Sequence, residues 1–292
     1  MSRIVYVNGA YLPYMQAKVH VEDRGFQFAD GVYEVCEIRG GALIDERRHI
    51  DRLHRSMSEL NMAPPMDRRA LGVVMRETVR RNRVRNGMVY LQVTRGAAKR
   101  DFAFPSADTP ATVVCIARAS KRLAGERRAA KGIRVVTMPD IRWRRVDIKT
   151  IALLPNALAR QAAYDAGADE AWLVDDRGFV TEGASCNAWI ITANDEMVTR
   201  PAETGILRGI TRTVLVELIA GEGLSLVERA FTVSEAKQAK EAFNSSATGV
   251  IMPVIAIDGA PIGGGQPGPI AMRLRQVFHD YAESSSGAAL LK

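Results

Sequence analysis

The chain carries a lysine and a glutamate that could act together in catalysis. Lys149 stands just before an alanine-rich stretch, and Glu182 follows further along, beside glycine and small polar residues. A lysine amine can form a Schiff base with an aldehyde, and a carboxylate can keep a pyridine nitrogen protonated so that the ring withdraws electrons. These are the two residue types that a pyridoxal phosphate cofactor needs, although their spacing alone does not specify one.

The composition restricts the class of protein. The 292 residues include 40 lysines and arginines against 33 aspartates and glutamates, which gives a formal net charge of +7. Arginine-rich stretches such as 142–145 form no continuous stripe and lack interleaved aromatic residues. We therefore expect a solvated surface biased toward anionic metabolites, in preference to a basic nucleic-acid-binding or scaffold protein.

The sequence shows no membrane or metal signature. It has no apolar run of about eighteen residues that could span a bilayer, and no charged leader followed by an apolar stretch. The cysteines, at positions 36, 115 and 186, are widely spaced and match neither a zinc pattern nor a disulfide framework. We expect a cytoplasmic protein that needs no metal, membrane or nucleic acid.

Residues 1–120 predict a small N-terminal α+β domain with an antiparallel sheet. Two hairpins are indicated by favoured turn residues, at Asn8-Gly9 and at Gly40-Gly41. Apolar residues at helical spacing predict two helices, and apolar runs predict two further strands. The helices are expected at 46–62 and 67–81, and the strands at 88–96 and 111–119.

The rest of the chain predicts a second, larger domain at 132–283, which the polar segment 121–131 connects to the first. Residues 284–292 are expected to form a frayed tail. No series of parallel β-α-β units is visible, so the sheet should be mainly antiparallel or mixed. Strands are expected at 133–138, 171–176 and 179–192, and helices at 155–166, 207–221, 234–241 and 270–282.

Six segments of the chain, taken in sequence order, together carry a family resemblance. They are DRGFQFADGVYEV, HIDRLHRS, DIKTIALLPNALARQAAYDAGADEA, VTEGASCNAWII, GILRGITR and FNSSATGVIMPV. These segments resemble the class IV pyridoxal-phosphate aminotransferases, a family that contains D-amino-acid and branched-chain aminotransferases and aminodeoxychorismate lyase. The resemblance covers nearly the whole chain and implies the two-domain α+β architecture of fold type IV, with pyridoxal 5'-phosphate as cofactor.

The resemblance gives roles to the residues around the expected cofactor ring. Lys149 is similar to the family's Schiff-base lysine, and Glu182 to the acid that pairs with the pyridine nitrogen. The matching leucine, Leu207, packs on the ring face in the family. Ser185 and Asn187 are candidates either to orient the ring or to satisfy turn amides.

Three further segments resemble the family's phosphate contacts. Arg52, in H-x-x-R, matches the phosphate-binding arginine, although its spacing is equally that of a solvated helix residue, and His49 is more typical of a structural histidine. The amides matching Ile210 and Thr211 hold the phosphate at the start of a helix. The third segment, Ser246-Ala247-Thr248, has alanine where threonine is usual, so we expect one hydrogen bond to come from Ser246, Thr248 or water.

The resemblance also points to residues that bind the substrate. Tyr33 and Arg100 match two groups that bind the substrate carboxylate in D-amino-acid members, and Thr248 is a further candidate because its loop resembles the family's second phosphate and substrate loop. The third group is usually a histidine, and this chain has Phe102 there, so its carboxylate pocket must differ. From the pattern alone, Tyr33 is also typical of a core aromatic residue and Arg100 of a solvated loop residue.

We interpret the chain as a transaminase that moves an amino group from a D-amino acid such as D-alanine to 2-oxoglutarate or pyruvate. The sequences Tyr33-Glu34-Val35 and LQVTRG are more similar to D-amino-acid members than to branched-chain ones. One cofactor serving two half reactions implies ping-pong kinetics. The alternatives are a branched-chain L-amino-acid aminotransferase, an (R)-amine transaminase and, less favoured, aminodeoxychorismate lyase. The family also implies a homodimer, in which Arg100 acts in its own or in the neighbouring subunit's site.

Overall fold

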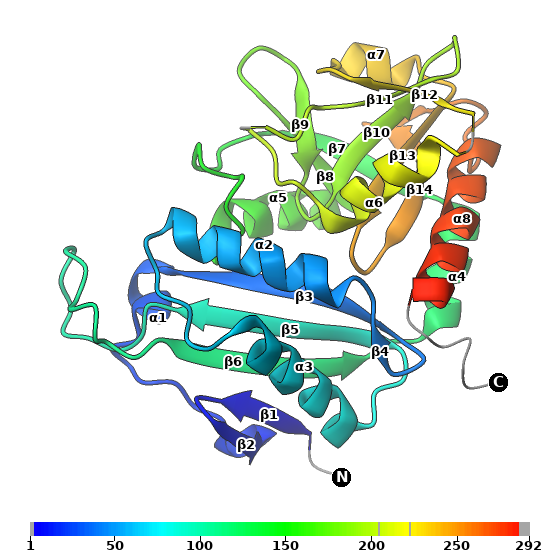
Figure 1. The fold of residues 1–292 in the computed structure, drawn as a ribbon. Coiled ribbons are helices and arrows are strands. Elements are labelled where there is room, and N and C mark those ends of the chain that lie inside the picture. The colour runs from blue at the N-terminus through cyan, green and yellow to red at the C-terminus, as the bar shows by residue number, and fades with distance from the viewer. Residues whose placement is uncertain (1–2, 204, 222, 286–292) are drawn as a thin grey trace. The chain divides into compact units, whose positions relative to one another are not determined.

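The chain divides into two compact units, shown in Figure 1. The computed structural model describes residues 3–203, 205–221 and 223–285. Unit 1 consists of Met1–Lys121, Ile148–Ala152 and Ala282–Lys292, and unit 2 of Arg122–Asp147 and Leu153–Tyr281. The segment 121–131, expected to be a connection, is mostly helix α4 (Arg122–Lys131) of unit 2. Lys149, expected in the larger domain, belongs to unit 1, and most of the expected tail lies outside the described residues.

Unit 1 is built on an antiparallel sheet of six strands among the described residues, in the order β2-β1-β6-β5-β3-β4. The strands are β1 (Ile4–Val7), β2 (Ala10–Pro13), β3 (Gly31–Arg39), β4 (Ala42–Leu43), β5 (Gly87–Thr94) and β6 (Thr112–Ala119). Both predicted hairpins are present. Asn8, Gly9, Gly40 and Gly41 all have positive φ, as the tight turns that suit twisted strands require.

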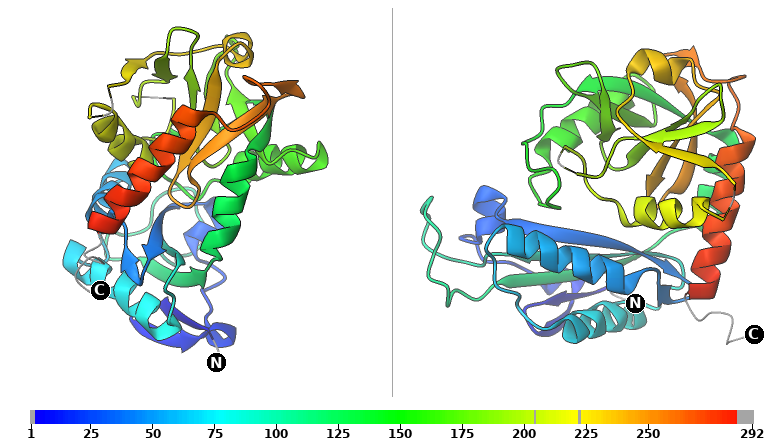
Figure 2. Two further views of the ribbon diagram at one scale, coloured as in Figure 1. Left: turned by 90° about the vertical axis from the view of Figure 1, so that its right-hand side faces the viewer. Right: turned by 45° about the horizontal axis from the view of Figure 1, so that its top comes forward.

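Helices α2 (Glu46–Glu59) and α3 (Arg68–Asn82) pack on one face of this sheet (Figures 1 and 2). Side chains alternate along a strand, so every second residue of β3 faces the helices. Val32 and Cys36 of β3 form a core with Leu53 and other apolar residues of α2. A short 3-10 helix, η1 (Tyr14–Gln16), and α1 (Arg24–Phe28) precede β3. Glu34 lies between Val32 and Cys36 on the helix-covered face, which places a carboxylate in an apolar layer.

Unit 2 contains a mixed sheet, which has nine strands within the described ranges. The path is β12-β11-β10-β13-β14-β7-β8-β9, and β15 pairs with β14. The strands are β7 (Ile133–Pro139), β8 (Glu170–Val174), β9 (Val180–Gly183), β10 (Asn187–Ile191), β11 (Glu196–Thr199), β12 (Ser225–Glu228), β13 (Glu241–Ser246), β14 (Val250–Ile257) and β15 (Ala260–Pro261). The pairs β7–β8, β7–β14 and β11–β12 are parallel and the others antiparallel, as the prediction of a mixed sheet allowed.

Two predicted elements of unit 2 depart most from expectation in where they end or break. The strand expected at 179–192 is broken into β9 and β10, because the amide of Gly183 donates to the carbonyl of Cys186 at 2.7 Å and closes a turn. The helix expected at 234–241 ends at Lys237, because Lys240 already donates to the carbonyl of Ile191 in the sheet. The helices of unit 2 are α4, α5 (Leu154–Asp165), α6 (Ile210–Ile219), α7 (Val233–Lys237) and α8 (Pro269–Ser285).

Glu241, at the start of β13, holds the first turn of α8. Its buried carboxylate accepts hydrogen bonds from the amides of Ile270 and Ala271, at 3.0 and 2.9 Å. A Cβ at Gly268 would lie 2.0 Å from this carboxyl group, so only glycine fits there. Figure 2 shows α8 beside the β13–β14 hairpin that this contact secures. Across the described ranges, no helix combines the length and apolar character needed to cross a bilayer.

Glu241→Ala is expected to lower the free energy of unfolding by roughly 1–2 kcal/mol, because two α8 amides lose their acceptor at the positive end of the helix. Chemical denaturation followed by circular dichroism measures the change. Asp176→Ala, in an exposed turn of the same unit, is the matched control and should have little effect. Equal stability of the two variants would contradict the capping role.

Candidate active site

The predicted site residues fall into two groups, one on each unit, and each group is described in its own unit. Unit 1 carries Tyr33, Arg52, Arg100, Phe102 and Lys149. Unit 2 carries Glu182, Leu207, Ile210, Thr211, Ser246, Ala247 and Thr248.

Lys149 is held against the first residues of β3. Its carbonyl accepts from the amide of Tyr33 at 3.0 Å, and its own amide donates to the hydroxyl of Ser56 at 3.3 Å. Ile148 and Thr150 on either side are buried. The Nζ atom lies 4.2 Å from the centroid of the Tyr33 ring, a favourable position for an ammonium group. Lys149 is therefore half-buried with a fixed backbone, and it stands beside a second predicted site residue.

Tyr33 is itself packed against another tyrosine. Its ring centroid lies 5.6 Å from that of Tyr90 on β5, whose hydroxyl donates to Gln92 at 2.6 Å. Burial, with the nearby Tyr33, raises the pKa of Tyr90 to about 12. Tyr90 thus remains neutral over the physiological range and supports Tyr33 as a fixed aromatic wall beside Lys149.

Arg52 of α2 lies in a buried ion pair. Its Nε and Nη2 atoms donate to the two carboxylate oxygens of Glu34 at 2.7 and 2.8 Å, and Nδ1 of His49 lies 2.7 Å from the same carboxylate. The Arg52 side chain is only 9% exposed, so it is not the solvated helix residue that its spacing allowed. Although burial alone would raise it, the charge and hydrogen bonds of Arg52, together with His49, hold the pKa of Glu34 at about 2.

Sequence reasoning missed the role of Glu34 as the partner of Arg52. The signal was present, since Glu34 occupies a position between Val32 and Cys36 where every second residue is apolar and faces a predicted helix. A carboxylate in that register needs a buried cation. His49, interpreted as structural, completes the pair as a hydrogen-bonding partner.

Arg100 and Phe102 lie on the long connection between β5 and β6. The Arg100 guanidinium carbon is 5.1 Å from the ring centroid of Phe28 and 6.0 Å from that of Phe102. The Phe28 and Phe102 rings lie 5.6 Å apart, and Phe102 is 82% exposed. These two residues therefore form an exposed cationic and aromatic surface, in contrast to the buried pair at Arg52.

Glu182 organises the candidate site of unit 2. It is buried and pairs with Arg142, which also binds Asp140 through Nε and Nη2 at 2.8 and 2.7 Å. Asn187 donates to Glu182 at 3.0 Å, and the amide of Leu207 approaches both carboxylate oxygens at 3.3 and 3.2 Å. These donors stabilise a negative charge on Glu182, which is the charge that a protonated ring nitrogen requires.

Arg142 was not assigned a role from the sequence. Burial alone would lower its pKa, but the bonds with Asp140 and the charge of Glu182 raise it above the usual range for arginine. Thr181 completes the network by donating to Asp140 at 2.7 Å. The alternation Asp140, Arg142 within one short segment is a visible signal, since side chains two residues apart in extended chain lie on the same side.

The two residues left open in the sequence have different roles. Asn187 donates to Glu182 and to the carbonyl of Leu207 at 2.9 Å, so it joins the acid to the following loop. Ser185 instead donates to Glu170 of β8 at 2.9 Å. Asn187 thus belongs to the Glu182 network, whereas Ser185 secures the turn between β9 and β10.

Helix α6 begins at Ile210, three residues after the predicted start, because the amide and carbonyl of Leu207 are already bonded to Glu182 and Asn187. Its N-cap residue, Gly209, provides no side-chain cap. A Cβ there would lie 2.2 Å from Oδ1 of Asn187, so glycine is required for this close approach. Uncapped amides at the start of a helix are a natural binding site for phosphate.

The turn with Ser246, Ala247 and Thr248 closes the β13–β14 hairpin. Ser246 pairs with Val250 in the register, and its hydroxyl accepts from the amide of Gly249 at 3.1 Å. A hydroxyl that accepts one bond can still donate another, so Ser246 keeps the donor capacity expected of it. Val250 has φ +57°, a conformation that costs a β-branched residue on the order of 1–3 kcal/mol.

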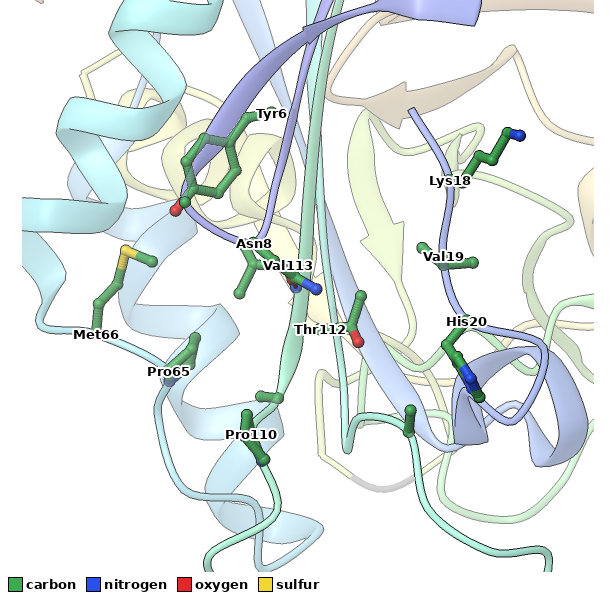
Figure 3. Close-up of a pocket in the computed structure, with 13 residues that line it drawn as sticks. Tyr6, Asn8, Lys18, Val19, His20, Pro65, Met66, Pro110, Thr112 and Val113 are labelled. Carbon is green, nitrogen blue, oxygen red and sulfur yellow. Dashed lines mark hydrogen bonds between the residues drawn. The ribbon is translucent and has the colours of Figure 1, made fainter. Parts of the chain in front are cut away.

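A pocket of about 470 Å³ lies elsewhere in unit 1 (Figure 3). Figure 3 shows Lys18 and His20 on one side of it and Met66 on the other, with Thr112 of β6 between them. The predicted cofactor and substrate residues are not among those that line it. In the part of the chain that the structure describes, no three His, Cys, Asp or Glu side chains are grouped to hold a metal ion.

Comparison with known proteins decides the family. The family model described as amino-transferase class IV matches residues 31–257. The chain belongs to the class IV aminotransferases. The D-alanine aminotransferase of Staphylococcus haemolyticus is 37% identical over 283 residues, which are 97% of this chain and 99% of that protein. The D-alanine aminotransferase of Bacillus licheniformis is 38% identical over 276 residues, 94% and 96% of the two chains.

Solved structures of class IV aminotransferases share the fold. The branched-chain amino acid aminotransferase of T.th., solved with pyridoxamine 5'-phosphate, has a TM-score of 0.89 and 28% identity, covering 98% of this chain and 95% of that one. The enzyme of the archaeon Thermoproteus uzoniensis, solved with norvaline, has a TM-score of 0.83 and 27% identity, covering 96% and 94%. The predicted family, α+β fold and aminotransferase class are confirmed, and the cofactor in the first of these structures bears out the predicted pyridoxal phosphate.

The buried pair of this aminotransferase gives a pH-dependent stability. Because the pKa of Glu34 falls from 4.5 to about 2 on folding, its contribution is complete above pH 4.5 and is lost as the pH falls toward 2. That shift corresponds to about 3 kcal/mol. Free energies of unfolding measured from pH 7 to pH 2 should therefore converge for the wild type and Glu34→Gln.

Glu59→Gln is the matched control for this measurement. Glu59 lies on α2, its side chain is 37% exposed and it faces Arg55 at 4.0 Å, so solvent screens its charge and the charge should contribute little. The free energy of unfolding of Glu59→Gln, plotted against pH, should run parallel to that of the wild type across the same range. A Glu34→Gln curve that is also parallel to the wild type would contradict the assigned pairing.

Proposed function

We propose that this class IV aminotransferase transfers an amino group from a D-amino acid similar to D-alanine to a 2-oxo acid such as 2-oxoglutarate or pyruvate. The observation that carries the proposal is the identity of 37% and 38% to two D-alanine aminotransferases over nearly their full lengths. The solved branched-chain enzymes share the fold, but at only 28% and 27% identity. A branched-chain L-amino-acid aminotransferase is therefore the less favoured alternative.

The residues of unit 2 fit pyridoxal 5'-phosphate. The uncapped start of α6 suits a phosphate group, and the tight Gly209–Asn187 contact leaves its first amides without a competing side chain. Ile210 and Thr211 would hold the phosphate, Leu207 would pack on the ring, and Glu182 would pair with the ring nitrogen. When bound, the cofactor supplies an electron-withdrawing ring that makes the substrate Cα–H acidic. Arg142 supports this chemistry by keeping a negative charge on Glu182.

The residues of unit 1 would supply the amine that binds the cofactor, from Lys149, and a guanidinium cation for its phosphate, from Arg52. Lys149 would anchor the cofactor and carry the proton at the substrate Cα as general acid and base. Its backbone bonds to Tyr33 and Ser56 limit the positions that Nζ can reach. Arg52 would bind the phosphate, and the bidentate pair with Glu34 fixes the plane of its guanidinium group.

Tyr33 and Arg100 of unit 1 would bind the substrate carboxylate, and Thr248 remains a further candidate for substrate binding. Phe102 stands where D-amino-acid members usually have a histidine, so the pocket has one donor fewer. Phe102 instead packs with Phe28, the ring that Arg100 also faces. Phe102 in place of histidine is the observation that favours the second candidate, a transaminase for (R)-amines, because such amines carry no carboxylate to bind.

The exposed aromatic residues of unit 1 support a homodimer. Phe26, Phe102 and Phe104 are 77%, 82% and 60% exposed, which is costly for aromatic side chains on an isolated chain. Arg95 lies 3.8 Å from the ring centroid of Phe104. Aromatic residues and arginine are typical of interface centres, and we propose that a second copy of the chain covers this surface.

The cysteines at 36, 115 and 186 form no disulfide bond, which suits the reducing cytoplasm that we propose as the location of the protein.

Turnover with three amino donors tests the proposed substrate. Purified protein with pyridoxal phosphate is offered D-alanine, L-leucine or (R)-1-phenylethylamine, each with 2-oxoglutarate, and the carbonyl product is measured. D-Alanine should be turned over fastest. Lys149→Ala should lose at least about 100-fold in rate, because it removes the general acid and base, whereas Lys131→Ala on the exposed face of α4 should not. Turnover of L-leucine without D-alanine would overturn the proposed specificity.

The molar mass of the protein, measured by light scattering as it elutes from a size-exclusion column, tests the proposed homodimer. The double variant Phe26→Ser, Phe104→Ser removes two exposed rings and should weaken the dimer at least about tenfold, as loss of interface aromatic residues commonly does. Leu123→Ser, equally exposed but on α4 of unit 2, is the control and should leave the dimer intact. A monomeric wild type, or equal dissociation of both variants, would refute the proposed surface.

A further inference from the structure

The turn between β13 and β14 ends at Val250, whose backbone conformation is unfavourable for a β-branched residue. Val250 is buried and has φ +57°, in the left-handed region that β-branched residues rarely adopt. Hairpins of this loop length commonly place glycine in the left-handed position, but here the glycine stands one residue earlier, at Gly249. Contacts from outside the turn must therefore hold Val250 in place.

Arg275 of α8 makes such contacts. Its Nη1 atom donates to the carbonyl oxygens of Gly249 and Ile251, each at 2.7 Å, so it binds the residues on both sides of Val250. The Arg275 side chain is 5% exposed. Its Nε and Nη2 atoms pair with Glu126 of α4 at 3.1 and 3.0 Å, which supplies the carboxylate that a buried guanidinium needs.

The same contacts lead directly to the predicted phosphate donors. Gly249, whose carbonyl is bound by Arg275, donates its amide to the hydroxyl of Ser246 at 3.1 Å. A shift of the backbone at Gly249 would therefore move Ser246 as well. Because Ala247 replaces the threonine usual in the family, fewer side-chain donors remain on this turn, and the position of each matters more.

We propose that Arg275 is a positioning residue, which holds the strained turn so that Ser246 and Thr248 are in place before the cofactor phosphate binds. The phosphate part rests on the proposed function. The restraint of the turn does not, because it follows from the contacts of Arg275 and the conformation of Val250 alone.

The test compares four variants with a control on the same helix. They are Arg275→Gln, Arg275→Lys, Val250→Gly and the double variant Arg275→Gln, Val250→Gly; Arg273→Gln, at an exposed position of α8, is the control. Two quantities are measured for each. One is the affinity of the apoprotein for pyridoxal phosphate, from the change in absorbance on titration. The other is the hydrogen exchange of peptides that cover 246–251.

Arg275→Gln should bind pyridoxal phosphate about tenfold more weakly, the loss expected for one or two buried hydrogen bonds, and exchange faster at 246–251. Arg275→Lys, which can keep one of the carbonyl bonds, should be intermediate. The double variant should recover both affinity and slow exchange, because glycine at 250 removes the strain that the arginine opposes. If Arg275 only stabilised the fold in general, glycine at position 250 would restore neither the affinity nor the slow exchange.

Three results would count against the proposal or one part of it. Equal affinity and exchange in Arg275→Gln and Arg273→Gln would overturn it. A double variant as impaired as Arg275→Gln would also overturn it, since strain at Val250 would then be irrelevant. Faster exchange with unchanged affinity would uphold the restraint and refute the phosphate role proposed for the turn. If Arg275→Gln does not fold, Arg275→Lys with and without Val250→Gly carries the same comparison.

Discussion

The ion pair of Glu182 with Arg142 is the interaction on which the candidate site of unit 2 depends. A buried carboxylate is stable only when charge and hydrogen bonds replace the lost water, and Arg142, Asn187 and the amide of Leu207 supply both. These partners come from three separate segments. Glu182 therefore joins the end of β9 to Asn187 at the start of β10 and to the loop at Leu207, after which α6 begins.

The same arrangement recurs at other points where the fold supports chemistry. Arg52 pairs with Glu34, and Arg275 pairs with Glu126 while holding two carbonyl groups. A guanidinium group suits this use because it stays charged and can bind a carboxylate with two of its donors and a backbone carbonyl with another. Part of the arginine excess in this chain is therefore structural. The expectation that the basic residues form a solvated surface holds for many arginines but fails for those that matter most to the site.

Patterns within one element were predictable, and pairings between elements were not. The two tight hairpins and the helix over Ile50 to Met57 follow from turn residues and apolar spacing, whereas the roles predicted for Lys149 and Glu182 rest on the resemblance of their segment to the family. The partners of Arg142, Arg52 and Arg275 lie 40, 18 and 149 residues away. Periodicity can mark one member of such a pair as buried, as it does for Glu34 between Val32 and Cys36, but it carries no information on which distant residue is the partner.

The residues predicted to bind the cofactor and the substrate differ in how strongly the fold constrains them. Glu182, Thr211 and the backbone around Lys149 are buried or bonded into networks, so a substitution there disturbs several partners at once. Phe102 lies on a long connection between strands, is 82% exposed and contacts the half-buried ring of Phe28. Loops of this kind tolerate change without cost to the core. Arg100 and Phe102, two of the residues proposed to bind the amino donor, therefore lie where the fold constrains a side chain least, whereas Tyr33 is fixed by its packing on Tyr90.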